Sequence, residues 1–170
     1  MVTPHIHVVP LAAGFSDDGL HILLSSYDRF TPDDIDADAD LFLVSAGEPP
    51  DCSQVIPSSG VLWPPNGKLQ DVALSGATDP DGDPVTLTVT GVTQDESVGP
   101  GGDAALGTSP SHVLLKANRS GNGDGRVYSV AFTASDGQST CTGTVKVSVP
   151  HSRGRAAVDS APPSYDSLGG

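Results

Sequence analysis

The chain has 170 residues, and its 21 acidic and 8 basic side chains give a formal net charge of −13 at pH 7. This excess of negative charge argues against a nucleic acid or an anionic membrane surface as partner, because the first contact is repulsive. The 36% hydrophobic content, 20 glycines and 15 prolines favour a modest core built from many short strands, that is, an all-β protein. No apolar run approaches the roughly 20 residues that a spanning helix needs, so we expect no membrane insertion.

The first 45 residues predict a partial structural unit. The stretches GFSDDGLHILLSS (14–26) and DLFLVS (40–45) are typical of strands, and an acidic, irregular segment separates them. Met1 is not followed by the basic start and uninterrupted apolar core of a secretory signal, so we expect it to mark a cut in a longer protein. Residues 46–51, AGEPPD, are predicted to be a linker, because consecutive prolines cannot join a β-ladder.

From residue 52 to residue 150 the sequence alternates between strand-like runs and turn clusters. The runs VTLTVT (85–90) and VYSVAFTA (127–134) place apolar side chains at every second position, so each strand is expected to bury one face. Strands also fit KLQDVALSG (68–76) and HVLLKA (112–117). About seven short antiparallel strands over about 100 residues predict an immunoglobulin-like (Ig-like) antiparallel β-sandwich.

The two cysteines stand at the two ends of this predicted sandwich. Cys52 opens it, and Cys141 shares one face of the last strand with Val145, Val147 and Val149. The two thiols are therefore placed to be neighbours, and a disulfide between them would close a loop of about 90 residues and stabilise the fold by roughly 4 to 5 kcal/mol. Such a bond indicates an oxidising compartment. The alternative is a pair of separate buried thiols.

The stretch GATDPDGDPVTLTVTG (76–91) places Asp79, Asp81 and Asp83 at every second position before a strand. Calcium takes about six to eight oxygen ligands, and alternating aspartates in a tight turn converge their carboxylates. Three carboxylates are too few for a tight site, so other loops have to contribute. The further candidate ligands are Asp95, Glu96 and Asp136. DPDG is also an ordinary β-turn sequence, and a solvated acidic turn is the alternative.

Two other segments are predicted to form neither a cation site nor a folded element. The acidic segment from Asp33 to Asp40 resembles the start of an EF-hand loop, but counting from Asp34 the sixth position is Ala39 instead of glycine and the twelfth is Ser45 instead of glutamate. We expect a solvated or turn-forming role there. Residues 151–170 have no periodicity and few large apolar side chains, which predicts a disordered tail.

Three stretches of the predicted sandwich carry a family resemblance. VLWPPNGKLQDVALSGATDPDGDPVTLTVTGVTQDE (61–96), GDGRVYSVAFTASDG (123–137) and CTGTVKVSVPH (141–151) together resemble bacterial extracellular Ig-like modules of the broad cadherin-like and PKD-like kind. The resemblance covers roughly residues 52–151 and implies a module of a large secreted protein. It also implies calcium ligation by the three alternating aspartates of the D.DGD stretch, 79–83.

The amino-terminal stretch FSDDGLHILLSSYDRFTPDDIDADADLFLVS (15–45) has a resemblance of its own. It is similar to the repeat of TolB-like β-propellers, in which S.DG..I.F.S opens a blade and D.D...DLF closes it. A single repeat unit cannot bury its own faces. The resemblance therefore implies that residues 1–45 are a partial blade at the end of a truncated propeller.

No catalytic constellation stands out in the sequence. The serines lack a G-x-S-x-G elbow, and neither cysteine has a neighbouring base. We therefore expect not an enzyme but a non-catalytic extracellular module, which serves a larger secreted protein as a spacer, stabiliser or adhesive unit with a protein or cell-surface partner. One alternative is an accessory domain of a secreted hydrolase or protease whose catalytic part lies upstream. Another is a carbohydrate-binding module, for which one tryptophan supplies a poor aromatic platform.

Overall fold

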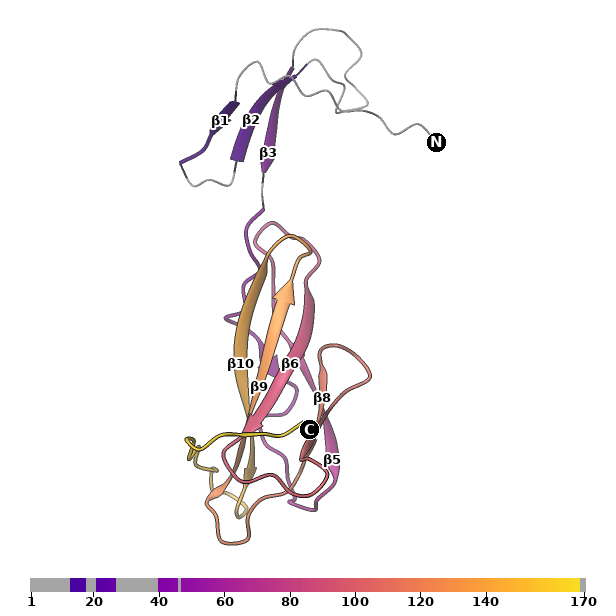
Figure 1. The fold of residues 1–170 in the computed structure, drawn as a ribbon, viewed down its shortest axis with the longest axis vertical. Helices are drawn as coiled ribbons and strands as arrows, with labels where there is room; N and C mark the ends of the chain where they lie inside the picture. Colours follow the sequence, from indigo (N-terminus) through magenta and orange to yellow (C-terminus); the bar gives the residue numbers. More distant parts are fainter. Residues whose placement is uncertain (1–12, 18–20, 27–39, 46, 169–170) are drawn as a thin grey trace. The chain divides into compact units, whose positions relative to one another are not determined.

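The computed structural model describes residues 13–17, 21–26, 40–45 and 47–168. The chain divides into two compact units, Met1–Glu48 and Pro49–Gly170. Every regular element in the described ranges is a β-strand, and all strand pairs within the three sheets are antiparallel, which confirms the all-β class (Figure 1). No helix that could span a membrane occurs among the described residues.

The first unit contains a three-stranded sheet. Its strands are β1 (Ala13–Phe15), β2 (His21–Ser26) and β3 (Asp40–Ser45), in the order β1-β2-β3. The two predicted strands are β2 and β3, which pair with Leu23 opposite Leu43 and Ile22 opposite Val44. Successive side chains of a strand point to opposite faces, so each face of this sheet carries apolar side chains. Residues 33–39 of the acidic segment lie outside the described residues.

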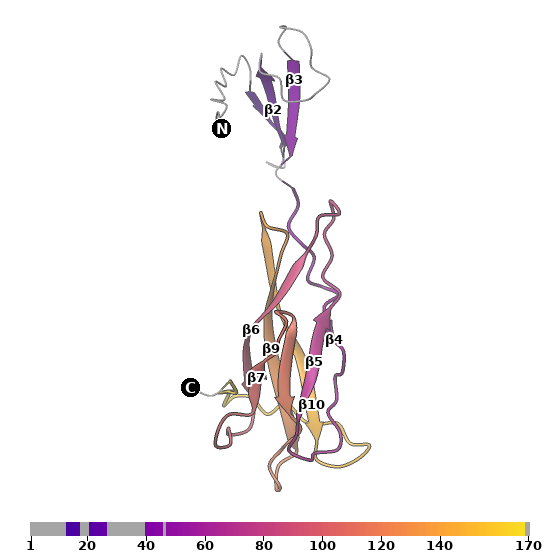
Figure 2. The same cartoon turned by 90° about the vertical axis from the view of Figure 1, so that its right-hand side faces the viewer.

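The second unit contains two four-stranded sheets. Their strands are β4 (Ile56–Pro57), β5 (Leu69–Ser75), β6 (Thr86–Gln94), β7 (Ala104–Leu106), β8 (His112–Lys116), β9 (Gly125–Ser135), β10 (Thr140–Pro150) and β11 (Tyr165–Asp166). One sheet has the order β10-β9-β6-β11 and the other the order β4-β5-β8-β7. Strands β10, β9 and β6 run side by side in Figure 1, and Figure 2 shows β4 and β5 in the turned view. Strands β4 to β10 fall within the range predicted for the sandwich, and β11 is additional.

The segment after β4 crosses from one sheet to the other. β4 pairs with β5, whereas Val61 forms a parallel bridge to Ser148 of β10. The N–H of Leu62 donates to the carbonyl of Ser148 at 2.8 Å, and the N–H of Ser148 donates to the carbonyl of Gly60 at 2.9 Å. The chain therefore joins the edges of both sheets and closes one side of the sandwich.

The core lies between the two sheets and is built mainly from valines. Its largest members include Leu62, Leu115, Tyr128 and Phe132, each at most 2% exposed. The predicted alternation in β9 and β10 is present, because the even-numbered residues 128–134 and the odd-numbered residues 145–149 are buried. The Phe132 ring lies over Gly143, where an added Cβ would come within 2.5 Å of the ring.

In β6 the inward face changes phase part-way along the strand. Pairing with β9 shifts between Val89 and Gly91, which marks a β-bulge at Thr90. Val89 is buried before the bulge, and Val92 and Gln94 are buried after it. An extra residue in one strand reverses which positions face inward, so strict alternation fails beyond the bulge.

The carboxyl-terminal segment differs from the expected disordered tail. Tyr165 and Asp166 pair with the edge of β6, and Ser167 is fully buried. The N–H of Ser167 donates to the carbonyl of Val92 at 2.9 Å, and the Ser167 carbonyl accepts from the N–H of Ala104 at 2.9 Å. The segment, yellow in Figure 1, is held mainly by such polar contacts. It has no apolar face, which is the feature that a search for periodicity detects.

Candidate functional site

The predicted disulfide closes the end of the sandwich that receives the linker. Cys52 and Cys141 are bonded, with their Cα atoms 6.0 Å apart. Just before Cys52, Asp51 exchanges backbone hydrogen bonds of 2.7 and 3.2 Å with Thr78. We call this the disulfide end. The bond confirms the predicted pairing, and its sequence separation of 89 residues gives the stabilisation of about 4 to 5 kcal/mol expected from loop closure.

The acidic loop 79–83 is a hydrogen-bonded turn at the disulfide end. Oδ1 of Asp79 accepts the N–H groups of Asp81 and Asp83 at 2.9 and 3.2 Å. Gly82 follows with a φ of 87°, a value that glycine adopts without strain. Oδ2 of Asp79 is buried and has no hydrogen-bond partner among the described residues. The loop therefore uses Oδ1 of Asp79 to build the turn, while Oδ2 accepts no hydrogen bond from the described residues.

The structure does not bring the six candidate calcium ligands together. Asp136 lies at the disulfide end, but Asp95 and Glu96 follow β6, whereas the acidic loop precedes it. A strand of nine residues spans about 30 Å, which separates the two groups. Within the described ranges, no three His, Cys, Asp or Glu side chains are close enough to hold a metal ion. A calcium hypothesis therefore has to rest on the loop itself.

Asp136 caps its own turn. Its Oδ1 accepts the N–H groups of Gln138 and Ser139, each at 2.6 Å. These hydrogen bonds from Ser139 and Gln138 favour the ionised carboxylate and hold the pKa of Asp136 below its usual value. The residue therefore shapes the hairpin between β9 and β10.

Asp95 fastens the carboxyl-terminal segment to the sandwich. Its side chain is buried, and Oδ1 accepts the N–H of Val127 at 2.9 Å. Oδ2 accepts the N–H of Ser160 at 3.1 Å and its hydroxyl at 3.4 Å. Both carboxylate oxygens thus accept hydrogen bonds from the protein, which gives Asp95 a structural role.

A buried ionic cluster that the sequence analysis missed lies at the opposite end, which we call the arginine end. Nη1 of Arg126 is 2.8 Å from Oδ2 of Asp103, and its Nε is 3.3 Å from Oε2 of Glu96. The Arg126 side chain is 4% exposed and that of Asp103 is 0% exposed. Oδ2 of Asp103 also accepts the N–H of Gly99 at 2.9 Å and the side-chain amide of Gln94 at 3.1 Å. The cluster joins β6 and β9 to the residue before β7.

The pKa values of this cluster favour the charged pair. Burial alone would raise the pKa of Asp103, but hydrogen bonds from Gly99 and Gln94 and the charges of Arg126 and Lys116 outweigh it, so the pKa lies below its usual value. Burial alone would lower the pKa of Arg126, but Tyr128 and the two carboxylates raise it. Asp103 and Arg126 therefore both stay ionised in the folded protein.

Tyr128 connects this cluster to the other sheet. Its hydroxyl donates to the carbonyl of Lys116 at 2.8 Å and accepts from Nη1 of Arg126 at 3.2 Å. Burial raises the pKa of Tyr128 to about 12, although the hydrogen bond and charge of Arg126 act in the other direction. The phenol therefore stays protonated and bonds β9 to the end of β8.

The sequence holds one signal for this cluster. Arg126 is in phase with Tyr128, Val130 and Phe132, the inward residues of β9. A charged side chain at an inward position needs a buried partner of opposite charge, because an isolated buried charge is very costly. The phase thus points to a carboxylate, but the sequence alone does not identify Asp103.

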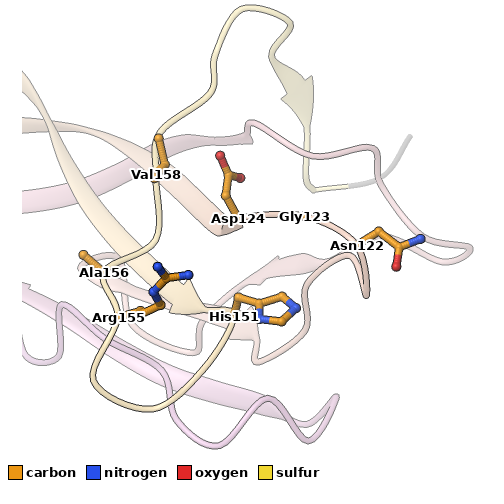
Figure 3. A pocket seen from close by; sticks show the side chains of 7 residues that line it. All are labelled: Asn122, Gly123, Asp124, His151, Arg155, Ala156 and Val158. Atoms are coloured by element: carbon orange, nitrogen blue, oxygen red, sulfur yellow. The ribbon is translucent and has the colours of Figure 1, made fainter.

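A hollow of about 790 Å³ lies beside the arginine end. It is lined by Asn122, Gly123, Asp124, His151, Arg155, Ala156 and Val158 (Figure 3). Beneath Gly123 lies Oε1 of Glu96, which is buried without a hydrogen-bond partner among the described residues, and an added Cβ at Gly123 would come within 2.5 Å of it. None of the lining residues is a tryptophan, tyrosine or phenylalanine, so the hollow lacks the large aromatic rings on which sugars stack.

Comparisons with models of known protein families, with curated proteins and with solved structures found no match for the chain. The functional proposal therefore rests on the sequence and on the geometry described above.

Proposed function

We propose that the chain supplies a non-catalytic spacer module of a larger extracellular protein. The observation that carries this proposal is the Cys52–Cys141 bond, which joins Cys52, close to the start of the second unit, to the last long strand. Disulfides form and persist in oxidising surroundings. This one closes the sandwich where the linker enters, at the place where a neighbouring domain would exert strain.

The strand order supports an Ig-like module. Reading β4 to β10 as strands A to G, the two sheets have the orders A-B-E-D and G-F-C, which is the constant-type arrangement. Tyr128 near the start of β9 bonds to the backbone at the end of β8, as a tyrosine corner does at the E–F connection. Both features favour a fold that in many proteins serves as a cell-surface or spacer domain.

The apolar faces of the first unit support the partial-blade interpretation. Phe15 is 74% exposed and belongs to the same face as Val44, whereas Leu23 and Leu43 belong to the other face and are also exposed. A repeat unit of a propeller is covered on both faces by its neighbours. We therefore propose that this sheet belongs to a larger array upstream of the spacer.

The acidic loop supports a secondary proposal, in which calcium stiffens the disulfide end. The buried Oδ2 of Asp79 favours this proposal, because a cation would satisfy it. The alternative function, an accessory domain of a secreted hydrolase or protease, shares the same fold and differs only in what lies upstream.

A retention assay tests the spacer against an adhesive or carbohydrate-binding module. The oxidised chain is mixed with insoluble cellulose, insoluble chitin or fixed bacterial cells, and the protein left in the supernatant is measured. A spacer stays in the supernatant to the same extent as an unrelated secreted β-sandwich of similar net charge. Retention that is lost in Trp63→Ala, the variant of the half-exposed tryptophan, would replace the spacer with a binding module.

A further inference from the structure

The disulfide creates a short covalent route through the second unit. A pull on the linker reaches Cys52, crosses the bond to Cys141 and continues along β10 to Pro150. Residues 53–140 form a closed loop that lies outside this route. Tension applied to the two ends of the unit therefore does not have to pass through most of the sandwich.

The strand on this route, β10, can hardly be lengthened by pulling. Extended β-structure rises about 3.3 to 3.4 Å per residue, and a fully stretched chain reaches at most about 3.6 Å per residue. The eleven residues of β10 are therefore already close to their full length. Pulling on Cys141 and Pro150 loads the strand along its axis without lengthening it.

The same strand is among the most firmly embedded in the sandwich. Every residue from Thr140 to Pro150 has a partner on β9. On its other edge, Ser148 exchanges backbone hydrogen bonds with the 60–62 segment. Val145, Val147 and Val149 face the core and are at most 9% exposed. The strand on the route is therefore held from both edges and from one face.

We propose that the second unit is a link that does not extend under tension, with the route from Cys52 through the disulfide and β10 to Pro150 carrying the force while the sandwich stays folded. The inference rests on the proposed spacer function and assigns it a mechanical role. The segment after Pro150 is the part that yields, because its pairing with the sandwich is short: β11 pairs with β6 at two residues, whereas β10 pairs with β9 at eleven. Another of its attachments, the Lys146–Asp159 ion pair of 2.9 Å, has side chains that are 53% and 40% exposed.

Single-molecule stretching of the full chain, held by handles at both termini, tests this route. In the oxidised chain we expect lengthening from residues 1–51 and from the segment after Pro150, and no further step. Reduction adds the closed loop, whose cysteines are 89 residues apart in sequence, and so releases roughly 300 Å more at about 3.4 Å per residue. The Cys52→Ser, Cys141→Ser double variant should show this step without reductant.

A second handle position tests whether the direction of pulling matters. One handle is placed at the amino terminus and the other is inserted at Gly101, in the loop between β6 and β7. The force then no longer runs along β10. The shorter arm of the closed loop, about 40 residues from Gly101 to Cys141, then becomes the taut path of roughly 140 Å. The oxidised sandwich should therefore unfold and lengthen under forces that it withstands when pulled from its ends.

Two results would overturn the inference. One is a step of about 300 Å in the oxidised chain pulled from its ends, which would remove the disulfide from the force path. The other is equal resistance in the two pulling directions, which would show that β10 plays no special part. Neither result bears on retention by polysaccharides or cells, so a failed route and a failed spacer function are distinguishable.

Discussion

The two ends of the sandwich are closed by different chemistry. At the disulfide end, Asp79 and Asp136 shape turns through backbone hydrogen bonds, and the covalent bond joins the start of the unit to its last long strand. At the arginine end, the carboxylates of Glu96 and Asp103 are buried against Arg126. Carboxylates near solvent contribute mainly local geometry, whereas buried ones commit the fold to a particular partner. The stability of each end should therefore respond to different perturbations.

The largest effect is expected from breaking the covalent closure. The Cys52→Ser, Cys141→Ser double variant should lose roughly 4 to 5 kcal/mol of unfolding free energy, because the unfolded chain regains the freedom of a long loop. Urea unfolding of the variant measures the loss, and wild-type protein under reductant is the control. A loss below about 1 kcal/mol would mean that this end is held by other contacts.

A slightly smaller effect is expected from Arg126→Met at the arginine end. Removal of one partner leaves Asp103 buried without its main counter-charge, which costs about 3 to 5 kcal/mol. We expect the lower part of that range, because Nζ of Lys116 lies 3.5 Å from Oδ1 of Asp103. The matched control is Arg126→Met combined with Asp103→Asn, which removes the stranded charge. If the double variant is no more stable than the single one, the ion pair does not determine stability at this end.

Tyr128→Phe should have an intermediate effect that depends on pH. At neutral pH the variant loses the hydrogen bond to the Lys116 carbonyl, at a cost of about 1 to 2 kcal/mol. The pKa of about 12 in the folded protein exceeds the ordinary value near 10, so the folded state holds the phenolic proton more tightly. This contribution is complete below about pH 10 and is lost as the pH rises through about 12.

Unfolding curves between neutral pH and about pH 12 measure that alkaline dependence. Wild-type stability should fall faster with pH over this interval than the stability of Tyr128→Phe, and Tyr165→Phe, at an exposed position, is the matched control. Identical alkaline slopes for wild type and Tyr128→Phe would contradict the buried, bonded phenol.

The smallest effect is expected from calcium at the acidic loop. A cation that binds only the folded state stabilises it by about 1.4 kcal/mol when its Kd is about one-tenth of the free cation concentration. Calorimetry in millimolar calcium should show this gain in wild type and a smaller gain in Asp81→Asn, with magnesium and matched sodium chloride as controls. A calcium response equal to that of sodium chloride would identify the loop as a screened acidic turn.

The sequence allowed the longer strands of the second unit, the inward faces of β9 and β10 and the disulfide to be predicted, because each of these depends on residue types at short spacing. The short strands β4, β7 and β11 were not predicted. Alternation around Val130 and Val147 revealed buried faces, and the position of Cys141 on such a face indicated its partner. The bulge at Thr90 was not predictable in this way, since one extra residue leaves no compositional trace. Beyond the bulge the buried positions of β6 are even-numbered, as at Val92, whereas alternation predicts odd-numbered ones.

The candidate site was predicted less well, because it depends on residues that are distant in sequence. Asp95 was grouped with the aspartates of the acidic loop on charge alone, but β6 lies between them. Asp103 lies in a glycine-rich loop that reads as solvent-exposed, and its burial depends on Arg126 from another strand. Long-range pairing of this kind is set by the packed fold and not by local pattern.

The most direct test of the central claim, an extracellular module closed by the Cys52–Cys141 bond, is peptide mapping without reduction on protein recovered from the cells that produce it. Free thiols are blocked at lysis, and the extracellular and intracellular fractions are digested and analysed separately by mass spectrometry. The account predicts that the protein is found in the extracellular fraction with the two cysteine peptides linked. Two blocked, unlinked cysteines in an intracellular protein would contradict it.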